Sequence, residues 1–257
     1  MAKITLLNLT APLLSLTLIS PAIQAEEQKP EDKMFGTWET SAELSIIATS
    51  GNTETTTFRG KIDAKQELEK WSNQYIFDSL FKEEETENDE GESVKQRSAE
   101  RYFASAQGNY KLKKEHSFLL IYAAHLEDKF GSFANNSIIS GGYGQRIFEF
   151  DDHTMDAEIG PGYRRGERDS GEIVKGPILR ASAVYRWQIS ENADFEQKLS
   201  VETGSGNTFS KSESYISAKV NGSLKMKFGF AISNNSVVDE GKDNVDTETT
   251  MTLVYSF

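Results

Sequence analysis

The chain ends in Met251-Thr252-Leu253-Val254-Tyr255-Ser256-Phe257, where large apolar side chains alternate with polar or smaller ones up to the free carboxyl terminus. Alternation with a period of two is typical of a β-strand with one apolar face. A soluble protein rarely ends in an exposed hydrophobic strand, because such an edge invites aggregation. In a bacterial outer-membrane barrel, the last strand pairs with the first and turns its apolar face to lipid. The stretch therefore predicts the closing strand of such a barrel, with a strand of a secreted β-sandwich as the alternative.

Four residues of this stretch also resemble the C-terminal assembly signal of outer-membrane barrels: Met251, Leu253, Tyr255 and Phe257. We expect the barrel assembly machinery to recognise this signal, and we expect Phe257 to be needed for efficient membrane assembly. The other partners implied are outer-membrane lipid and lipopolysaccharide, which would surround a monomeric barrel.

The amino-terminal segment has the features of a secretory signal peptide. Lys3 gives a short basic start, residues 4–19 carry no charge and are mostly apolar, and Ala25 precedes an acidic pair. The apolar run is too short for a spanning helix and ends in a cleavage-like site. The sequence therefore predicts a signal peptide over 1–25, a periplasmic lead segment over 26–36 and a barrel over 37–257.

The composition excludes several classes of protein. Without the signal peptide, 27 basic and 40 acidic residues remain, so the net charge is 27 − 40 = −13. An acidic balance of this size argues against nucleic-acid binding. The chain has no cysteine, which rules out disulfides, thiolate metal sites and cysteine nucleophiles. The mean hydropathy of −0.53 is compatible with a barrel, in which only alternate strand residues face lipid.

Alternating segments recur along the whole chain, separated by polar, glycine-rich or acidic breaks. Long helical periodicity is absent. The pattern predicts twelve antiparallel strands, an even number that puts both ends of the barrel chain on the periplasmic side. The predicted strands span residues 37–50, 53–69, 73–83, 94–110, 116–127, 136–148, 154–165, 177–189, 193–204, 213–222, 225–235 and 247–257.

The connections differ between the two ends of the predicted barrel. Breaks after odd-numbered strands are long, polar or acidic, and breaks after even-numbered strands are short. Long outer loops and short periplasmic turns are typical of bacterial barrels. The long loops are expected over 84–93, 128–135, 166–176, 205–212 and 236–246, and a tight tip at residues 50–53 is the exception. Gly160-Pro161-Gly162 predicts a bulge or bend inside a strand, because proline cannot donate to a β-ladder.

Aromatic residues gather near the short-turn ends of the predicted strands, and all three tryptophans are among them. Amphipathic aromatic side chains are expected at the level of the lipid headgroups. The set comprises Trp38, Trp71, Tyr110, Phe118, Phe148, Phe150, Trp187, Phe195 and Phe257.

Two short motifs carry a resemblance to a known family. The segment 43–55, with Ser50-Gly51-Asn52-Thr53 at its tip, resembles the Ser-Gly-Asn-Thr hairpin of the salt-induced outer-membrane protein family, a domain of unknown function. Ile159-Gly160-Pro161-Gly162-Tyr163-Arg164 resembles the Gly-Pro-Gly-Tyr segment of that family, and the likeness covers roughly residues 37–257. The resemblance implies an outer-membrane barrel with a link to salt stress, and it implies no catalytic residue and no cofactor.

The sequence predicts neither a catalytic site nor a metal site. His116, His125 and His153 are scattered and form no ligand pair of the usual spacing. No Gly-x-Ser-x-Gly elbow or phosphate loop is present. An outer-membrane hydrolase, the most distant alternative, would carry serine and histidine on the lipid-facing rim, whereas we predict that His125 faces the lumen. The acidic segment 83–92 matches no calcium loop and is interpreted as a solvated loop.

The alternation assigns charged residues of both signs to the interior of the predicted barrel. Basic residues outnumber acidic ones there, which would favour anionic solutes. The alternative is that these side chains form cross-strand ion pairs and fill a narrow lumen. Two functions follow, a narrow passive channel for small anionic solutes and a plugged structural barrel of the stressed envelope. The candidate lining residues are Arg59, Lys61, Arg101, Arg146, Arg164, Arg180, Arg186, Asp156, Glu158, Glu196, Lys198 and Glu202.

Overall fold

The computed structural model describes residues 36–49, 55–87 and 93–257. The predicted signal peptide, the lead segment up to residue 35 and the motif tip at 50–53 lie outside the described residues, as do residues 88–92 of the acidic segment. No helix in the described part of the chain is long and apolar enough to cross a membrane.

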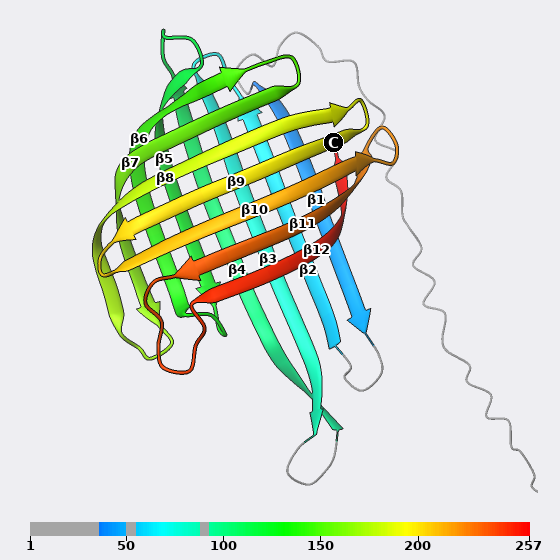
Figure 1. The fold of residues 1–257 in the computed structure, drawn as a ribbon, viewed down its shortest axis with the longest axis vertical. Coiled ribbons are helices and arrows are strands. Elements are labelled where there is room, and N and C mark those ends of the chain that lie inside the picture. Colours follow the sequence, from blue (N-terminus) through cyan, green and yellow to red (C-terminus); the bar gives the residue numbers. More distant parts are fainter. Residues whose placement is uncertain (1–35, 50–54, 88–92) are drawn as a thin grey trace, which may run out of the picture. The chain divides into compact units, whose positions relative to one another are not determined.

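Twelve β-strands close into one antiparallel barrel, in which each strand pairs with its neighbours in sequence and β1 pairs with β12 (Figure 1). The predicted fold class and strand number are therefore confirmed. The strands are β1 (Thr37–Thr49), β2 (Thr55–Glu67), β3 (Trp71–Glu87), β4 (Ser93–Lys111), β5 (Ser117–Asp128), β6 (Phe133–Glu149), β7 (His153–Arg168), β8 (Ile173–Ser190), β9 (Ala193–Gly204), β10 (Asn207–Lys219), β11 (Leu224–Asn235) and β12 (Val245–Ser256).

At one end of the barrel the strands extend further than the alternation predicts. β3 runs to Glu87, β6 begins at Phe133 and β8 begins at Ile173, each inside an expected loop (84–93, 128–135 and 166–176), and β3 and β4 protrude beyond their neighbours (Figure 1). The extension of β3 over residues 84–87 is polar on both faces, so a pattern of apolar residues cannot reveal it. The extensions of β6 and β8 contain apolar residues, namely Phe133, Ile173 and Val174, but are too short to show a period of two. The expected loop 205–212 shrinks to a two-residue turn at Ser205 and Gly206, whose φ angles of 53° and 75° suit a type I′ hairpin.

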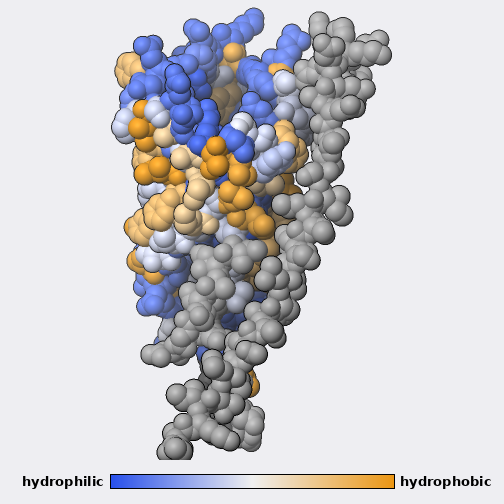
Figure 2. All heavy atoms as spheres, turned by 90° about the vertical axis from the view of Figure 1, so that its right-hand side faces the viewer, coloured by the Kyte–Doolittle hydropathy of each residue, from blue (hydrophilic) through white to orange (hydrophobic). Residues whose placement is uncertain are grey.

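Apolar side chains cover the outside of the barrel. Large hydrophobic residues are exposed on the outer face of every strand; Ile121 is 55 % exposed and Met251 is 59 % exposed. Figure 2 shows apolar side chains gathered in a band between two hydrophilic ends. A soluble β-sandwich buries its apolar faces, so this inverted arrangement excludes the alternative fold and is that of an outer-membrane barrel.

The Gly160-Pro161-Gly162 segment lies within β7 and does not form the predicted bulge. The register between β6 and β7 is unchanged across it, and shifts occur instead near Phe133 and between Arg146 and Phe148. A Cβ atom at Gly160 would lie only 2.2 Å from the carbonyl oxygen of Gly141. Glycine is needed there because the two backbones approach each other closely.

Aromatic contacts follow the short-turn end of the barrel, where the sequence predicts an aromatic ring. Trp71 packs edge-on against Tyr110 with ring centroids 5.3 Å apart, and His153 stacks on Trp187 at 5.4 Å. Pairs of this geometry add to the stabilisation that burial alone gives. The ends of neighbouring strands are thereby tied together where a membrane interface would lie.

The closure between β1 and β12 is short. Its ladder covers residues 41–44 of β1 and 253–256 of β12. Thr40 and Phe257 add a reciprocal pair of backbone hydrogen bonds of 3.0 and 3.2 Å. The terminal strand therefore closes on the first strand, as the sequence predicts. The large side chains of its assembly signal, Met251, Leu253, Tyr255 and Phe257, are all exposed, and their role in assembly stays a prediction.

Candidate functional site

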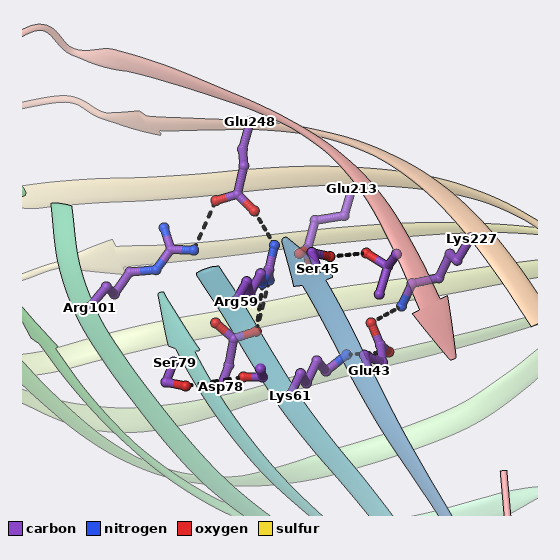
Figure 3. A network of polar contacts seen from close by, with 12 residues as sticks. Glu43, Ser45, Arg59, Lys61, Asp78, Ser79, Arg101, Glu213, Lys227 and Glu248 are labelled. Carbon is purple, nitrogen blue, oxygen red and sulfur yellow. Dashed lines mark hydrogen bonds and ion pairs between the residues drawn. The ribbon is translucent and has the colours of Figure 1, made fainter. Parts of the chain in front are cut away.

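The interior of the barrel is crossed by ion pairs, and the first group joins strands on both sides of the closure. The Glu248 carboxylate on β12 accepts hydrogen bonds from Arg59 on β2 and from Arg101 on β4, the latter at 2.8 Å (Figure 3). Arg59 also binds Asp78 on β3 at 2.8 Å. Since β1, β2 and β3 separate β12 from β4 in the barrel, the Arg101–Glu248 pair is a chord across the lumen.

A second group contains two lysines that share one carboxylate. Lys61 on β2 lies 3.5 Å from Glu43 on β1, and Lys227 on β11 binds the other oxygen of the same group (Figure 3). The ammonium group of Lys227 also lies 4.8 Å from the ring centroid of Tyr215, and that of Lys198 lies 5.7 Å from it. Cation–π contacts stabilise a positive charge without neutralising it. Lys198 has an acid of its own, Glu196 at 3.0 Å, so the excess of positive charge in this group is that of Lys61 and Lys227 over Glu43.

The facing wall holds a third group. Arg180 on β8 lies 3.3 Å from Glu158 on β7, and its guanidinium lies 4.0 Å from the ring centroid of Tyr122 on β5. Arg164 is 1 % exposed and donates a hydrogen bond of 2.6 Å to Glu202. Nε and Nη1 of Arg164 are buried and have no hydrogen-bond partner among the described residues. Buried polar groups without a partner are costly, so these atoms fit an interior that admits water.

A fourth group forms an alternating chain of charges at the short-turn mouth. Arg146 bridges Glu149 and Asp156 at 2.9 and 2.8 Å. Arg186 then bridges Asp156 and Glu196 at 3.0 and 3.1 Å, and Lys198 lies 3.0 Å from Glu196. Each acid here has a basic neighbour on the next strand or on its own strand. The mouth is polar and carries balanced charge.

All twelve residues predicted to line the lumen take part in these four groups. The sequence analysis missed several of their partners, namely Glu43, Tyr215, Lys227 and Glu248. The position of Glu248 could have been predicted. Met251 and Leu253 face outwards, so alternation along the same strand places residue 248 in the interior. That the twelve residues line an open pore stays a prediction.

The prediction for His125 was wrong. Its side chain lies on the outer face with Leu119 and Ile121, which are 50 % and 55 % exposed. The Nδ1 atom of His125 lies 2.8 Å from Oγ of Ser137 on β6, and Nε2 lies 3.9 Å from the nearest oxygen of Glu127. A nucleophile–base–acid relay needs hydrogen-bond reach at both steps, and the second separation exceeds it. Over the described residues, no group of three or more His, Cys, Asp or Glu could hold a metal ion.

The connection between β11 and β12, residues 236–244, lies against two other connections at the opposite end. Asp239 accepts a hydrogen bond of 2.9 Å from the backbone N–H of Ser170, between β7 and β8. Lys242 donates one of 3.0 Å to the carbonyl oxygen of Phe130, between β5 and β6. The N–H of Ser170 lowers the pKa of Asp239 below its ordinary value of 3.8. Three hairpins are thereby joined at this end of the barrel.

The sequence matches a family model and one curated protein. The family described as "Protein of unknown function, DUF481" matches residues 42–257. The uncharacterized protein YdiY of Escherichia coli K12 is 29 % identical over 162 residues, which are 63 % of this chain and 64 % of that protein. The chain thus spans less than two thirds of the relative's length.

Two solved structures are similar to this chain. The NanC porin is superimposed with a TM-score of 0.51 over 85 % of this chain and 98 % of the porin, at 8 % identity. An outer membrane channel from Pseudomonas putida F1 is superimposed with a TM-score of 0.49 over 90 % of this chain and all of that chain, at 10 % identity. At 8 % identity the likeness to the NanC porin shows the barrel fold alone.

Proposed function

Because this chain belongs to the DUF481 family of proteins of unknown function, we propose a function from its own interior: a narrow, passive and non-enzymatic channel for small anionic solutes. Its place would be the bacterial outer membrane, after export through the periplasm. Barrel diameter grows with strand number, so twelve strands enclose a lumen between the filled eight-stranded type and the wide porins.

One observation carries the preference for anions. Lys61 and Lys227 share the single carboxylate of Glu43. Rings of basic side chains favour anions in pores. A solute with a carboxylate or a phosphate would find an unbalanced positive charge there, held by rigid strands.

The test is conductance in a planar bilayer with the purified barrel. We expect small channels whose reversal potential in a salt gradient shows anion preference. The variant Lys61→Gln leaves Glu43 paired with Lys227 and should shift the reversal potential toward zero. A matched control, Lys70→Gln, removes the same charge from an exposed turn and should keep the preference.

The choice of lysines matters for this experiment. Arg101, Arg180 and Arg186 are equally basic lumen residues, but each binds a carboxylate at 3.3 Å or less. Neutralising all three would leave Glu158 without a basic partner and would remove links between strands, which would destabilise the barrel. A loss of anion preference in such a variant would therefore not distinguish changed selectivity from impaired folding.

A second function is supported by the chord across the lumen. The Arg101–Glu248 pair and the Arg180–Tyr122 contact both bridge strands that are not neighbours. Side chains held in this way can plug the lumen, which would make the protein a structural barrel of the stressed envelope. Absence of conductance from about 0.1 to 1 M salt, a range over which exposed charges become screened, would overturn the channel and favour the plugged barrel.

A further inference from the structure

A row of polar residues crosses four neighbouring strands on the outer face of the barrel, near its long-loop end. His125 on β5 lies opposite Ser137 on β6, Ser137 lies opposite Arg165 on β7, and Arg165 lies opposite Lys175 on β8. We call these four residues the outer basic row. Three strand spacings of about 4.8 Å give the row a length of about 14 Å.

The two cations of the outer basic row have no acidic partner. Arg165 and Lys175 are both exposed, and among the described residues no ion pair joins either of them to an acid. Like charges directly opposite each other on one face of a sheet are destabilising. An anion between the two side chains would remove this repulsion. At one end of the row, His125 and Ser137 add a hydrogen-bonded pair 2.8 Å apart.

The row borders the apolar surface. One step along the strands towards the apolar band lie Ile139, which is 55 % exposed, and Tyr163, which is 48 % exposed. One step the other way lie Glu127 and Glu167, and Glu167 accepts a hydrogen bond of 3.1 Å from Asn135. On β8 the residue beyond Lys175 is Ile173, which is apolar and 54 % exposed. The cations therefore lie next to apolar surface.

The rest of the outer surface at this end offers a contrast. The corresponding outward positions on β9, β10 and β11 are uncharged, with Thr203 opposite Thr208 and Ser210 opposite Asn234. On the other side, Arg97 of β4 lies 3.6 Å from Glu83 of β3, so the outward charge there has an acidic partner. Arg165 and Lys175 differ from it because they face each other without an acid between them.

We propose that the outer basic row binds the phosphate of an anionic lipid of the outer leaflet, lipid A of lipopolysaccharide, whose acyl chains would lie along Ile139 and Tyr163. Arginine and lysine side chains donate charge-assisted hydrogen bonds to phosphate oxygens. A lipid would contact both the apolar surface and the two cations, whereas free phosphate would contact only the cations. The site lies outside the lumen, so it is independent of the proposed channel.

The test measures lipid A bound to the full barrel in detergent, by native mass spectrometry after addition of purified lipid A. The variant Arg165→Gln/Lys175→Gln should bind about tenfold more weakly, the loss expected for about 1.4 kcal/mol of contacts. The control Lys70→Gln/Lys113→Gln, at the opposite end, should bind as the native barrel does. A heat-dependent shift in gel mobility verifies that each variant is folded.

Two further probes separate the sources of phosphate. Lipid A stripped of its phosphates should bind the native barrel as weakly as native lipid A binds the double variant. Inorganic phosphate at a tenfold molar excess over lipid A should not displace it. Equal binding by the native barrel and the double variant would overturn the proposal, and so would displacement by inorganic phosphate. If the double variant fails to fold, the single variant Lys175→Gln replaces it, and undiminished binding there counts against the proposal.

Discussion

Two interfaces of this barrel are held together in different ways. Between β6 and β7 a long ladder runs from Phe133 to Glu149, and glycines let the two backbones approach closely. Between β1 and β12 the ladder covers only residues 41–44 and 253–256. Beyond this short ladder, side chains make the contacts. Ser45 and Thr252 share a hydrogen bond of 2.7 Å, and Glu248 binds two arginines.

The difference reflects where the chain begins and ends. β6 and β7 are joined by a short turn, so their pairing costs little loop-closure entropy. β1 and β12 come from opposite ends of the barrel chain and must find each other late. At the closure, ion pairs from β12 to β2 and β4 help to hold the strands together, as the longer backbone ladder does at other interfaces. The stability of the β6–β7 interface should be sensitive to side-chain atoms added at its glycines. The stability of the β1–β12 closure should be sensitive to the loss of a charged side chain.

The largest effect is expected from Gly160→Ala. The new Cβ atom would lie 2.2 Å from the carbonyl oxygen of Gly141 and 2.5 Å from the Cα atom of Gly142, so the backbone itself must move. We expect a loss of about 3 kcal/mol in the free energy of unfolding, measured by urea titration in lipid vesicles.

Gly60→Ala is the matched control for this variant. Its Cβ atom would have ordinary contacts, the nearest at 3.6 Å, and its effect should stay within about 0.5 kcal/mol. Equal destabilisation by both variants would show that the close approach of β6 and β7 is not what requires glycine at position 160.

Glu248→Ala should have the next largest effect, because it leaves Arg59 with one acidic partner and Arg101 with none. Removing one member of a buried pair typically costs 3–5 kcal/mol. The Glu248 side chain is 30 % exposed, so water offsets part of the loss and we expect about 2 kcal/mol. The measurement is the same urea titration.

Glu213→Ala tests whether the loss of stability depends on the closure or follows from the removal of any acid in the lumen. Glu213 pairs with Lys211 and Tyr215 on its own strand, so its removal breaks no link between β12 and the far strands. We expect about 1 kcal/mol or less. A larger loss for Glu213→Ala than for Glu248→Ala would contradict the special role of the closure.

The same contrast explains what the sequence could and could not predict. Strand number, closure and outward parity follow from a period of two that any apolar face imposes, as Leu253 and Tyr255 illustrate. The polar end of β3 at residues 84–87 was not predicted, because neither face there is apolar. The position of His125 was misjudged because Ala123, between it and Ile121, gives only a weak apolar signal.

Pairing between distant strands was beyond the reach of alternation. Parity places Arg101 and Glu248 in the same lumen, but nothing in either segment says that they meet across three strands. That contact depends on the tilt and register of the whole barrel. For the same reason, Gly160-Pro161-Gly162 could be read as a bulge, since the close approach of β6 is visible only when both strands are in place.

A smaller effect is expected from deletion of Phe257. The deletion removes the reciprocal backbone hydrogen bonds with Thr40, each worth about 1 kcal/mol, from a ladder that is already short. We expect a loss of about 1–2 kcal/mol and a lower yield of folded barrel in the membrane. Phe257→Ala keeps both backbone bonds and loses only a ring that is 68 % exposed.

These two variants separate the backbone from the side chain at the terminus. If the closure depends on backbone pairing, Phe257→Ala should be more stable than the deletion in the urea titration. The yield in cells reports on the predicted assembly signal, because it includes recognition of the ring. Unchanged yield in both variants would rule out a role for Phe257 in assembly.

The smallest effect concerns a contact that reinforces neither interface, between the β7–β8 and β11–β12 connections. The N–H of Ser170 stabilises the ionised form of Asp239 and so lowers its pKa below 3.8. A group whose pKa is lowered on folding stabilises its contact above its ordinary pKa, and the contribution is lost as the pH falls through the folded-state pKa. The Ser170 amide should therefore be protected from hydrogen exchange at about pH 5 and lose protection below pH 3.8, after correction for the intrinsic rate. Asp239→Asn should show no such transition, because the amide side chain does not titrate. Protection in the native barrel that persists unchanged to about pH 2 would mean that the carboxylate charge of Asp239 does not hold the two connections together.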